Sequence, residues 1–177
     1  MRRERGSTLK PRKTTLPVMF ATNTRPRRRR RALRRVATLV ARGTPADELF
    51  AAVPGEVGQL LQADQTSMSR YESDGMVTVV AGWSRTGDAA PPVGARLRLG
   101  GKNLTTIVSQ TRRPARMASY ADASGANGEA ARQAGLRSAV GAPIIAEGRL
   151  WGVMIGGSSE HPLPWTPRRV SPRSRTL

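Results

Sequence analysis

The strongest constraint on the fold of this 177-residue chain is a pair of apolar segments near its C-terminal end. Residues 138–145 and 150–158 are rich in Val, Ile, Ala and Gly, and the short segment 146–149 separates them. Two such segments joined by a few residues that include glycine are typical of a β-hairpin. An isolated hairpin is only marginally stable in water, so we expect this hairpin to close a larger sheet.

Further strand and helix patterns precede this hairpin. Asp74–Gly75 is a strong turn signal between two predicted strands, residues 65–72 and 76–83. Shorter strands are predicted at 95–99 and 115–118, and short helices near 104–108 and 128–134. Alternation in the second strand predicts that one face carries Val77, Val79, Ala81 and Trp83. The order of elements indicates an α+β fold, with a mainly antiparallel sheet of about six strands flanked by helices.

Two helices are predicted before the first strand. Residues 30–42 place apolar side chains at helical spacing and end before Gly43. The second helix starts with Thr44 as N-cap and Pro45 at the first helical position. Pro54 and Gly55 interrupt its apolar pattern, so we expect a kink or break near Val53.

Charge is distributed unevenly along the chain. The formal net charge is +18, yet residues 43–160 hold 11 Lys and Arg against 11 Asp and Glu. Residues 1–42 hold 15 basic residues and one acid, and residues 161–177 hold four Arg and no acid. We therefore predict a basic disordered segment over 1–30, a neutral folded domain over 31–160 and an irregular Pro/Arg/Ser-rich tail over 161–177.

Composition excludes several kinds of chemistry. The chain has no cysteine, which removes disulfides, thiolate metal sites and cysteine nucleophiles. His161 is the only histidine, and one histidine cannot build a metal site. No nucleophile–base constellation is evident, which argues against an enzyme. The longest apolar runs are too short for a membrane span or a signal peptide, so we expect a cytoplasmic protein. We also expect that it needs no cofactor.

Several stretches resemble the GAF domains of bacterial sensor histidine kinases. The most informative are residues 135–144 and 148–153, which are similar to the closing strand pair of that family. Other matching stretches, in chain order, are 32–41, 45–50, 58–64, 70–72, 74–75 and 81–83. This resemblance implies a sensory or regulatory domain in two-component signalling, with a six-stranded sheet, a ligand pocket between one sheet face and its loops, and a homodimer in the intact protein.

The chain departs from the family pattern at two places. Pro54–Gly55 lies where the family has an unbroken helix. After Pro164, where the family's long C-terminal helix should begin, the residues are rich in Arg, Pro and Ser. Sequence of this kind is typical of a shifted reading frame, so we expect a truncated kinase fragment in which that helix and the kinase catalytic elements are missing.

The resemblance also indicates which residues approach a ligand. Trp83, Tyr120 and Trp151 are the aromatic candidates, although packing is the alternative for each. Asn103 and Arg137 are the polar candidates, although each also fits a solvated surface position. The identity of the ligand stays open.

A nucleic-acid-binding protein is the alternative from another functional class. Five consecutive arginines, Arg27, Arg28, Arg29, Arg30 and Arg31, could bind phosphates through counterion release. The neutral charge of residues 43–160 argues against this alternative, because nucleic-acid-binding domains usually carry their basic residues on the fold itself.

Overall fold

A computed structural model of the chain describes residues 46–87, 92–160 and 162–163. Side chains are described from residue 51 onwards. Several predicted features lie outside the described residues: the helix 30–42, the arginines 27–31, the cap at Thr44 and Pro45, His161 and nearly all of the C-terminal tail. The prediction that the family's C-terminal helix is missing also concerns residues outside the described ranges.

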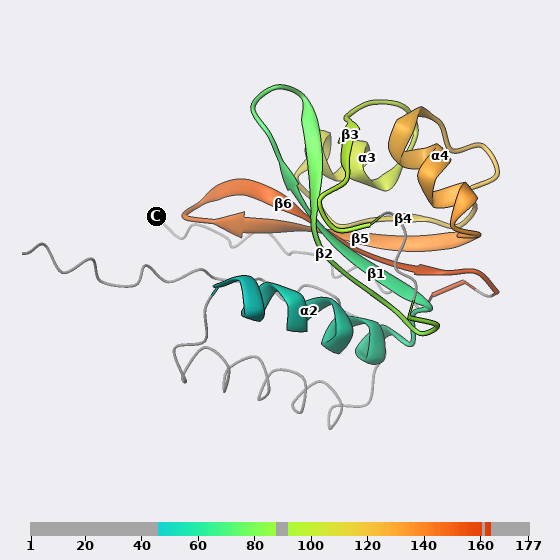
Figure 1. Ribbon diagram of the computed structural model, residues 1–177. Helices are drawn as coiled ribbons and strands as arrows, with labels where there is room; N and C mark the ends of the chain where they lie inside the picture. The colour runs from blue at the N-terminus through green and yellow to red at the C-terminus, as the bar shows by residue number, and fades with distance from the viewer. Residues whose placement is uncertain (1–45, 88–91, 161, 164–177) are drawn as a thin grey trace, which may run out of the picture.

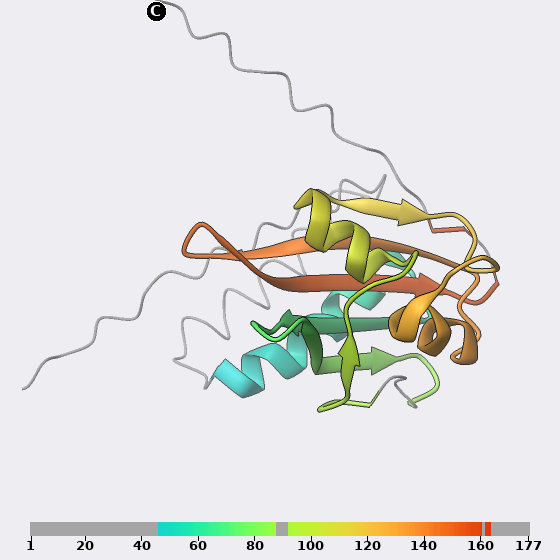
Figure 2. The same ribbon diagram turned by 90° about the horizontal axis from the view of Figure 1, so that it is seen from above.

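The described chain forms one antiparallel sheet of six strands, in the order β3-β2-β1-β6-β5-β4 (Figures 1 and 2). The fold class predicted from the sequence is therefore confirmed. The predicted closing hairpin pairs over its whole length, from Ser138 with Ser158 to Ala146 with Arg149. The strands are β1 (Gln65–Tyr71), β2 (Met76–Ser84), β3 (Arg96–Arg98), β4 (Ala115–Met117), β5 (Ser138–Ala146) and β6 (Arg149–Ser158).

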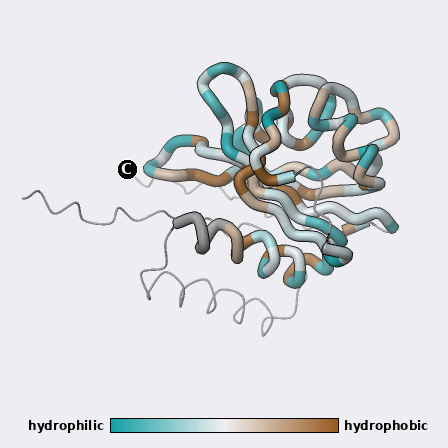
Figure 3. The backbone as a smooth tube through the Cα atoms, viewed as in Figure 1, coloured by the Kyte–Doolittle hydropathy of each residue, from teal (hydrophilic) through white to brown (hydrophobic). Residues whose placement is uncertain are grey.

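Helices cover both faces of this sheet. Helix α2 (Ala46–Leu61) lies against one face, and α3 (Leu104–Thr111) and α4 (Gly125–Gln133) lie over the other (Figure 1). A separate apolar core fills each side: Leu61 of α2 packs with Met68 and Met154, and Leu104 of α3 packs with Tyr120. Hydrophobic residues recur along the strands, whereas the hairpin turns are hydrophilic (Figure 3). Strand β1 is central and covered on both faces.

A β-bulge in β2 makes one prediction wrong. Met68 pairs with Ala81 and the next residue, Ser69, pairs with Val79, so Val80 is the extra residue. An extra residue in one strand reverses the inside–outside alternation on either side of it. Val79 therefore faces α3 and α4, while Ala81 and Val80 pack into the core beneath α2. The four residues Val77 to Trp83 predicted to share a face are split between two faces.

Helix α2 is continuous, so the break predicted near Val53 does not occur. Pro54 lies inside the helix and is fully buried. Proline removes one helical hydrogen bond, which favours a break when nothing else supports the helix. Here the Thr66 hydroxyl donates to the Pro54 carbonyl at 2.7 Å, and the neighbouring Val53 packs in the core. Tertiary contacts thus hold the helix through a residue with poor helix propensity.

The core extends past the last strand. Leu163 is 2% exposed and packs with residues beneath α2, including Leu61 and Ile144. The first residues of the segment predicted as a tail therefore contribute to the folded domain.

Candidate functional site

A small cavity lies between the sheet and the helices α3 and α4. Its volume is about 50 Å³, and its lining comes from β1, β2, β3 and β6 on the sheet side and from the α3 and α4 regions on the other. One water requires roughly 10–15 Å³ of such volume. The cavity therefore has room for a few waters, whereas sites for drug-sized ligands measure about 300–1,000 Å³.

The floor of this cavity is polar because of β1. Gln65, Ser67 and Ser69 alternate along the strand and all line the cavity. Ser69 is 7% exposed, although it lies on a strand covered on both faces. Neither Ser67 nor Ser69 forms a side-chain hydrogen bond to another described residue. No described side-chain N or O atom is both buried and unpaired, so these two hydroxyls stay accessible from the cavity. A central strand with accessible hydroxyls is typical of a cavity that holds water or a ligand.

Hydrogen bonds from β1 tie both covering helices to the sheet. At one end of the strand, the Tyr71 hydroxyl donates to the Thr105 carbonyl in α3 at 2.7 Å. At the other end, the Gln65 side-chain amide donates to the Ala134 carbonyl after α4 at 3.3 Å. Burial raises the pKa of the Tyr71 phenol, so this donor stays protonated. The cavity lies between these two attachments.

Asn103 lines the cavity and also organises the loops above it. Its side-chain oxygen accepts from the Thr106 amide at 3.0 Å and so caps α3. Its side-chain nitrogen donates to the carbonyls of Gly100 at 2.8 Å and Ser124 at 3.0 Å. Asn103 is 1% exposed, so the alternative prediction of a solvated surface position is wrong for this residue. The side-chain amide is committed to protein partners, so its role at the cavity is structural.

A second, larger hollow opens on the surface beside the cavity. This cleft measures about 590 Å³ and is lined by the β4–α4 segment, the turn before β5 and the chain after β6. Arg137 is exposed and lines the cleft, and Arg132 and Glu160 lie along the same cleft. Tyr120 lines both cleft and cavity and is 3% exposed. Three of the predicted ligand-contacting residues, Asn103, Tyr120 and Arg137, thus lie on one side of the sheet.

The two predicted tryptophans lie on the opposite side. Trp83 lies over Gly55 and Gly58 of α2, and Trp151 packs against the core beneath α2. Trp151 is the extra residue of a second bulge, because Ile144 pairs with Gly152 and Ile145 with Leu150. Neither tryptophan lines the cavity or the cleft. The structure therefore does not bring them together with the other three candidates.

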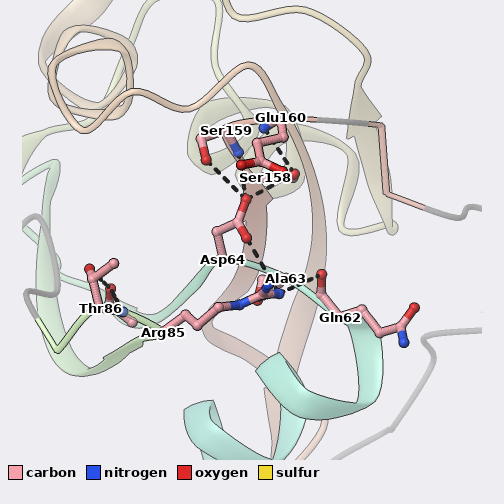
Figure 4. Close-up of polar contacts among 9 residues, drawn as sticks. Gln62, Ala63, Asp64, Arg85, Thr86, Ser158, Ser159 and Glu160 are labelled. Atoms are coloured by element: carbon pink, nitrogen blue, oxygen red, sulfur yellow. Dashed lines mark hydrogen bonds and ion pairs between the residues drawn. The ribbon is translucent and has the colours of Figure 1, made fainter.

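A polar junction joins the end of α2 to the ends of β2 and β6 (Figure 4). One oxygen of Asp64 accepts from the Ser159 amide at 2.9 Å and from the hydroxyls of Ser158 and Ser159 at 3.0 Å. The other oxygen lies 3.4 Å from the guanidinium of Arg85. Arg85 also donates to the carbonyls of Gln62 and Ala63 at the end of α2. Asp64 thus connects the chain segments that enter and leave the sheet.

The described residues contain no group of three or more His, Cys, Asp or Glu side chains placed to hold a metal ion. In the same part of the chain, no helix is long and apolar enough to cross a membrane.

Comparison with known proteins identifies the family. The model of the GAF domain matches residues 45–171, so the chain belongs to the GAF domain family. GAF domains are sensory, ligand-binding modules of signalling proteins. A comparison with curated proteins gives no match.

Solved structures of GAF domains share this fold. The phycocyanobilin-bound GAF domain of a cyanobacterial phytochrome is 20% identical, with a TM-score of 0.60 over 80% of this chain and 82% of that chain. A phycoerythrobilin-bound GAF domain, also from a cyanobacterial phytochrome, is 18% identical with a TM-score of 0.62, over 81% of this chain and 85% of that chain. The GAF domain of a phosphoenolpyruvate-protein phosphotransferase from Coxiella burnetii is 20% identical with a TM-score of 0.56, over 73% of this chain and 77% of that chain.

Sequence reasoning missed the polar floor of the cavity. Residues 65–72 give only a weak strand signal in the sequence, because Met68 and Tyr71 are the only large apolar residues there. The signal was present in the alternation itself: every second residue from Gln65 to Ser69 is polar in what proves to be a central strand. Only the position of β1 inside the sheet gives this alternation its meaning.

Proposed function

We propose that this chain is a sensory module that binds a small polar ligand between the sheet and the helices α3 and α4. The observation that carries this proposal is the polar floor of β1, where Ser67 and Ser69 face a cavity with hydroxyls that no other described group pairs. These hydroxyls are accessible from the cavity and are therefore available to hydrogen-bond a small polar ligand. Waters occupy the same positions when no ligand is bound.

The same strand provides a route from the cavity to the other side of the sheet. Met68 packs in the core with Val53 and Leu61 of α2, and Thr66 donates to the Pro54 carbonyl. A ligand that shifts β1 therefore changes the contacts of α2. A ligand biases such a module only through its different affinity for two conformations. We expect α2 and the Asp64 junction to differ between these conformations.

Bilins are bound by two of the similar structures, but this chain favours a smaller ligand. A cavity of about 50 Å³ is far below the size of a drug-sized site. The chain also has no cysteine, which removes a thioether attachment for a bilin. We therefore propose reversible binding of a small molecule.

We also propose where the domain acts and what it acts on. By its resemblance to sensor histidine kinases, the domain acts as a cytoplasmic homodimer that biases an output domain and has no catalysis of its own. Incubation of the chain with labelled ATP is expected to give no phosphate incorporation.

Native mass spectrometry of the freshly purified chain tests the binding proposal. A co-purified small molecule is expected, and its retention should fall in Ser69→Ala, which removes only the hydroxyl from the cavity floor. Ser109→Ala, a change in α3 away from both hollows, serves as the matched control. A chain that carries no ligand and whose melting temperature no member of a metabolite library raises would contradict the proposal.

A further inference from the structure

The inner cavity and the outer cleft are separated by two side chains. Tyr120 and Leu136 are the only residues that line both hollows among those described. These two residues thus form the wall between a cavity of about 50 Å³ and a larger, more open cleft of about 590 Å³. If either moved, the two hollows would join into a single site within the size range of small-molecule pockets.

The two parts of this wall differ in how firmly they are held. Tyr120 is 3% exposed, and its phenol oxygen accepts a hydrogen bond from the Leu104 amide. Leu136 is half-buried and lies in the turn between α4 and β5, with its side chain resting directly on Gly157. A β-carbon at position 157 would collide with the Leu136 side chain. The Leu136 backbone amide donates to the Ala131 carbonyl, but its side chain is held by packing alone. A change of the Leu136 rotamer is therefore the less costly way to open the wall.

The cleft beside Leu136 is suited to an anion. Arg132 and Arg137 line it, and neither forms an ion pair within the described part of the chain. Glu160 is the one acidic residue in the lining, which leaves a net positive charge. The backbone of Arg137 is fixed on both sides, because its amide donates to the Ser158 carbonyl and its carbonyl accepts from the Tyr120 amide. The Arg137 side chain therefore starts from a fixed point beside the wall and lines the cleft.

We infer that cavity and cleft form one binding site for a small organic anion, and that Leu136 is its gate. This inference rests on the proposed function and specifies its ligand class. The anionic group binds beside Arg137 and Arg132 in the cleft, where water remains accessible. The uncharged end of the ligand displaces Leu136 from Gly157 and reaches the hydroxyls of Ser67 and Ser69.

Binding of two matched probes tests this inference. The probe 4-hydroxybenzoate has a carboxylate at one end and a hydroxyl at the other, and 4-hydroxybenzamide has the same shape without the charge. Leu136→Ala removes the gate, and Leu150→Ala is the control because Leu150 is also half-buried but lines neither hollow. Affinities are measured on the full chain by isothermal titration calorimetry, and melting temperatures check that each variant is folded.

If Leu136 limits access, a ligand binds only the fraction of molecules in which Leu136 has moved aside. Removing the Leu136 side chain then raises the apparent affinity by the inverse of that fraction. We expect Leu136→Ala to bind 4-hydroxybenzoate on the order of tenfold more tightly than wild type, and Leu150→Ala to bind as wild type does. Arg137→Gln should weaken binding of 4-hydroxybenzoate several-fold and leave 4-hydroxybenzamide nearly unchanged.

Two results would overturn the inference. Equal affinity of wild type and Leu136→Ala, including no binding by either, contradicts the gate. Equal effects of Arg137→Gln on both probes contradict the anionic ligand. Neither result touches the proposed function, which native mass spectrometry and Ser69→Ala test separately. A folded Leu136→Ala variant that binds both probes equally would leave the gate supported and the ligand class wrong.

Discussion

Asn103 shows how one buried amide can hold two loops together. Its side chain uses both the oxygen and the nitrogen, and so joins the start of α3 to the segments at Gly100 and Ser124. Gly101 completes the contact, because its backbone has a φ of +79° and a β-carbon there would collide with the Ser124 carbonyl. Glycine meets both requirements without strain.

We predict that Asn103→Ala lowers the free energy of unfolding by about 1–3 kcal/mol, because it removes an N-cap and leaves buried carbonyls without donors. Urea denaturation followed by circular dichroism measures the loss. Asn127→Ala is the control, since Asn127 makes one exposed hydrogen bond, to the Arg98 carbonyl. If Asn103→Ala loses no more stability than the control, the Asn103 hydrogen bonds are not a main support of the loops above the cavity.

We predict that the stability of the domain depends on pH because of Asp64. Burial acts to raise the pKa of this carboxyl, but hydrogen bonds from Ser159 and Ser158 and the charge of Arg85 outweigh it and hold the pKa below its ordinary value of 3.8. A carboxyl with a lowered pKa in the folded state binds protons less readily than in the unfolded chain. Its stabilising contribution is complete above about pH 4 and is lost as the pH falls through the folded-state pKa.

Asp64→Asn should therefore be less stable than wild type at pH 7 by about 1–2 kcal/mol, since three hydrogen bonds lose a charged acceptor. As the pH falls from about 4 through the lowered folded-state pKa of Asp64, the difference should shrink until the two proteins are similar in stability. Thermal denaturation from pH 2.5 to pH 7 measures the difference, with the exposed Asp122→Asn as control. A difference that stays constant across this range would mean that the charge of Asp64 is not what stabilises the junction.

At the scale of elements, α2 and β2 meet at an unusually close contact. The ring of Trp83 occupies the space that a side chain at Gly58 would need, and it also touches the space beside Gly55. The absence of side chains at these two helical positions lets a large aromatic ring lie flat against the helix. This contact explains why glycines with poor helix propensity stand in the middle of α2.

Gly58→Ala is consequently expected to destabilise the domain by about 1–3 kcal/mol through overpacking, although alanine is the better helix former. Trp83→Leu in the same chain should recover part of this loss, because a smaller side chain leaves room for the added methyl group. A double-mutant cycle by chemical denaturation gives the coupling between the two positions. A stabilising Gly58→Ala would show that the Trp83 ring moves aside at little cost.

At the scale of the whole molecule, charge and fold are separated. The described domain lies within the neutral residues 43–160, while the basic excess lies before and after this range. Any affinity for nucleic acid should therefore depend on the segment with Arg27 to Arg31.

We predict that replacing Arg27 to Arg31 by serine in the full chain removes most DNA binding and reduces its dependence on salt, because fewer counterions are released. Replacing Arg112, Arg113 and Arg116 of the described domain by serine should change binding little. Fluorescence anisotropy at several salt concentrations compares the variants. If the domain variant loses more affinity than the Arg27 to Arg31 variant, the domain itself is a nucleic-acid-binding surface.

The closing hairpin and the α+β class could be predicted from the sequence, because they depend on local patterns, and the GAF family could be predicted from resemblance. Residues 138–145 and 150–158 are apolar, of strand length and separated by a short turn, and these properties survive in any tertiary context. The helix α3 was likewise predicted from its apolar spacing after Gly100 and Gly101, whereas α4 begins at Gly125, three residues before the predicted start.

Only the tertiary structure decided which side of the sheet each residue faces. The bulges at Val80 and Trp151 come from pairing with distant strands, and each reverses the alternation on which sequence reasoning depends. This is why Trp83 and Trp151 lie beneath α2 while Asn103, Tyr120 and Arg137 gather on the other side. The cavity itself is formed by β1, α3 and α4 packing together, so no local pattern could reveal its size or the position of Leu136 in its wall.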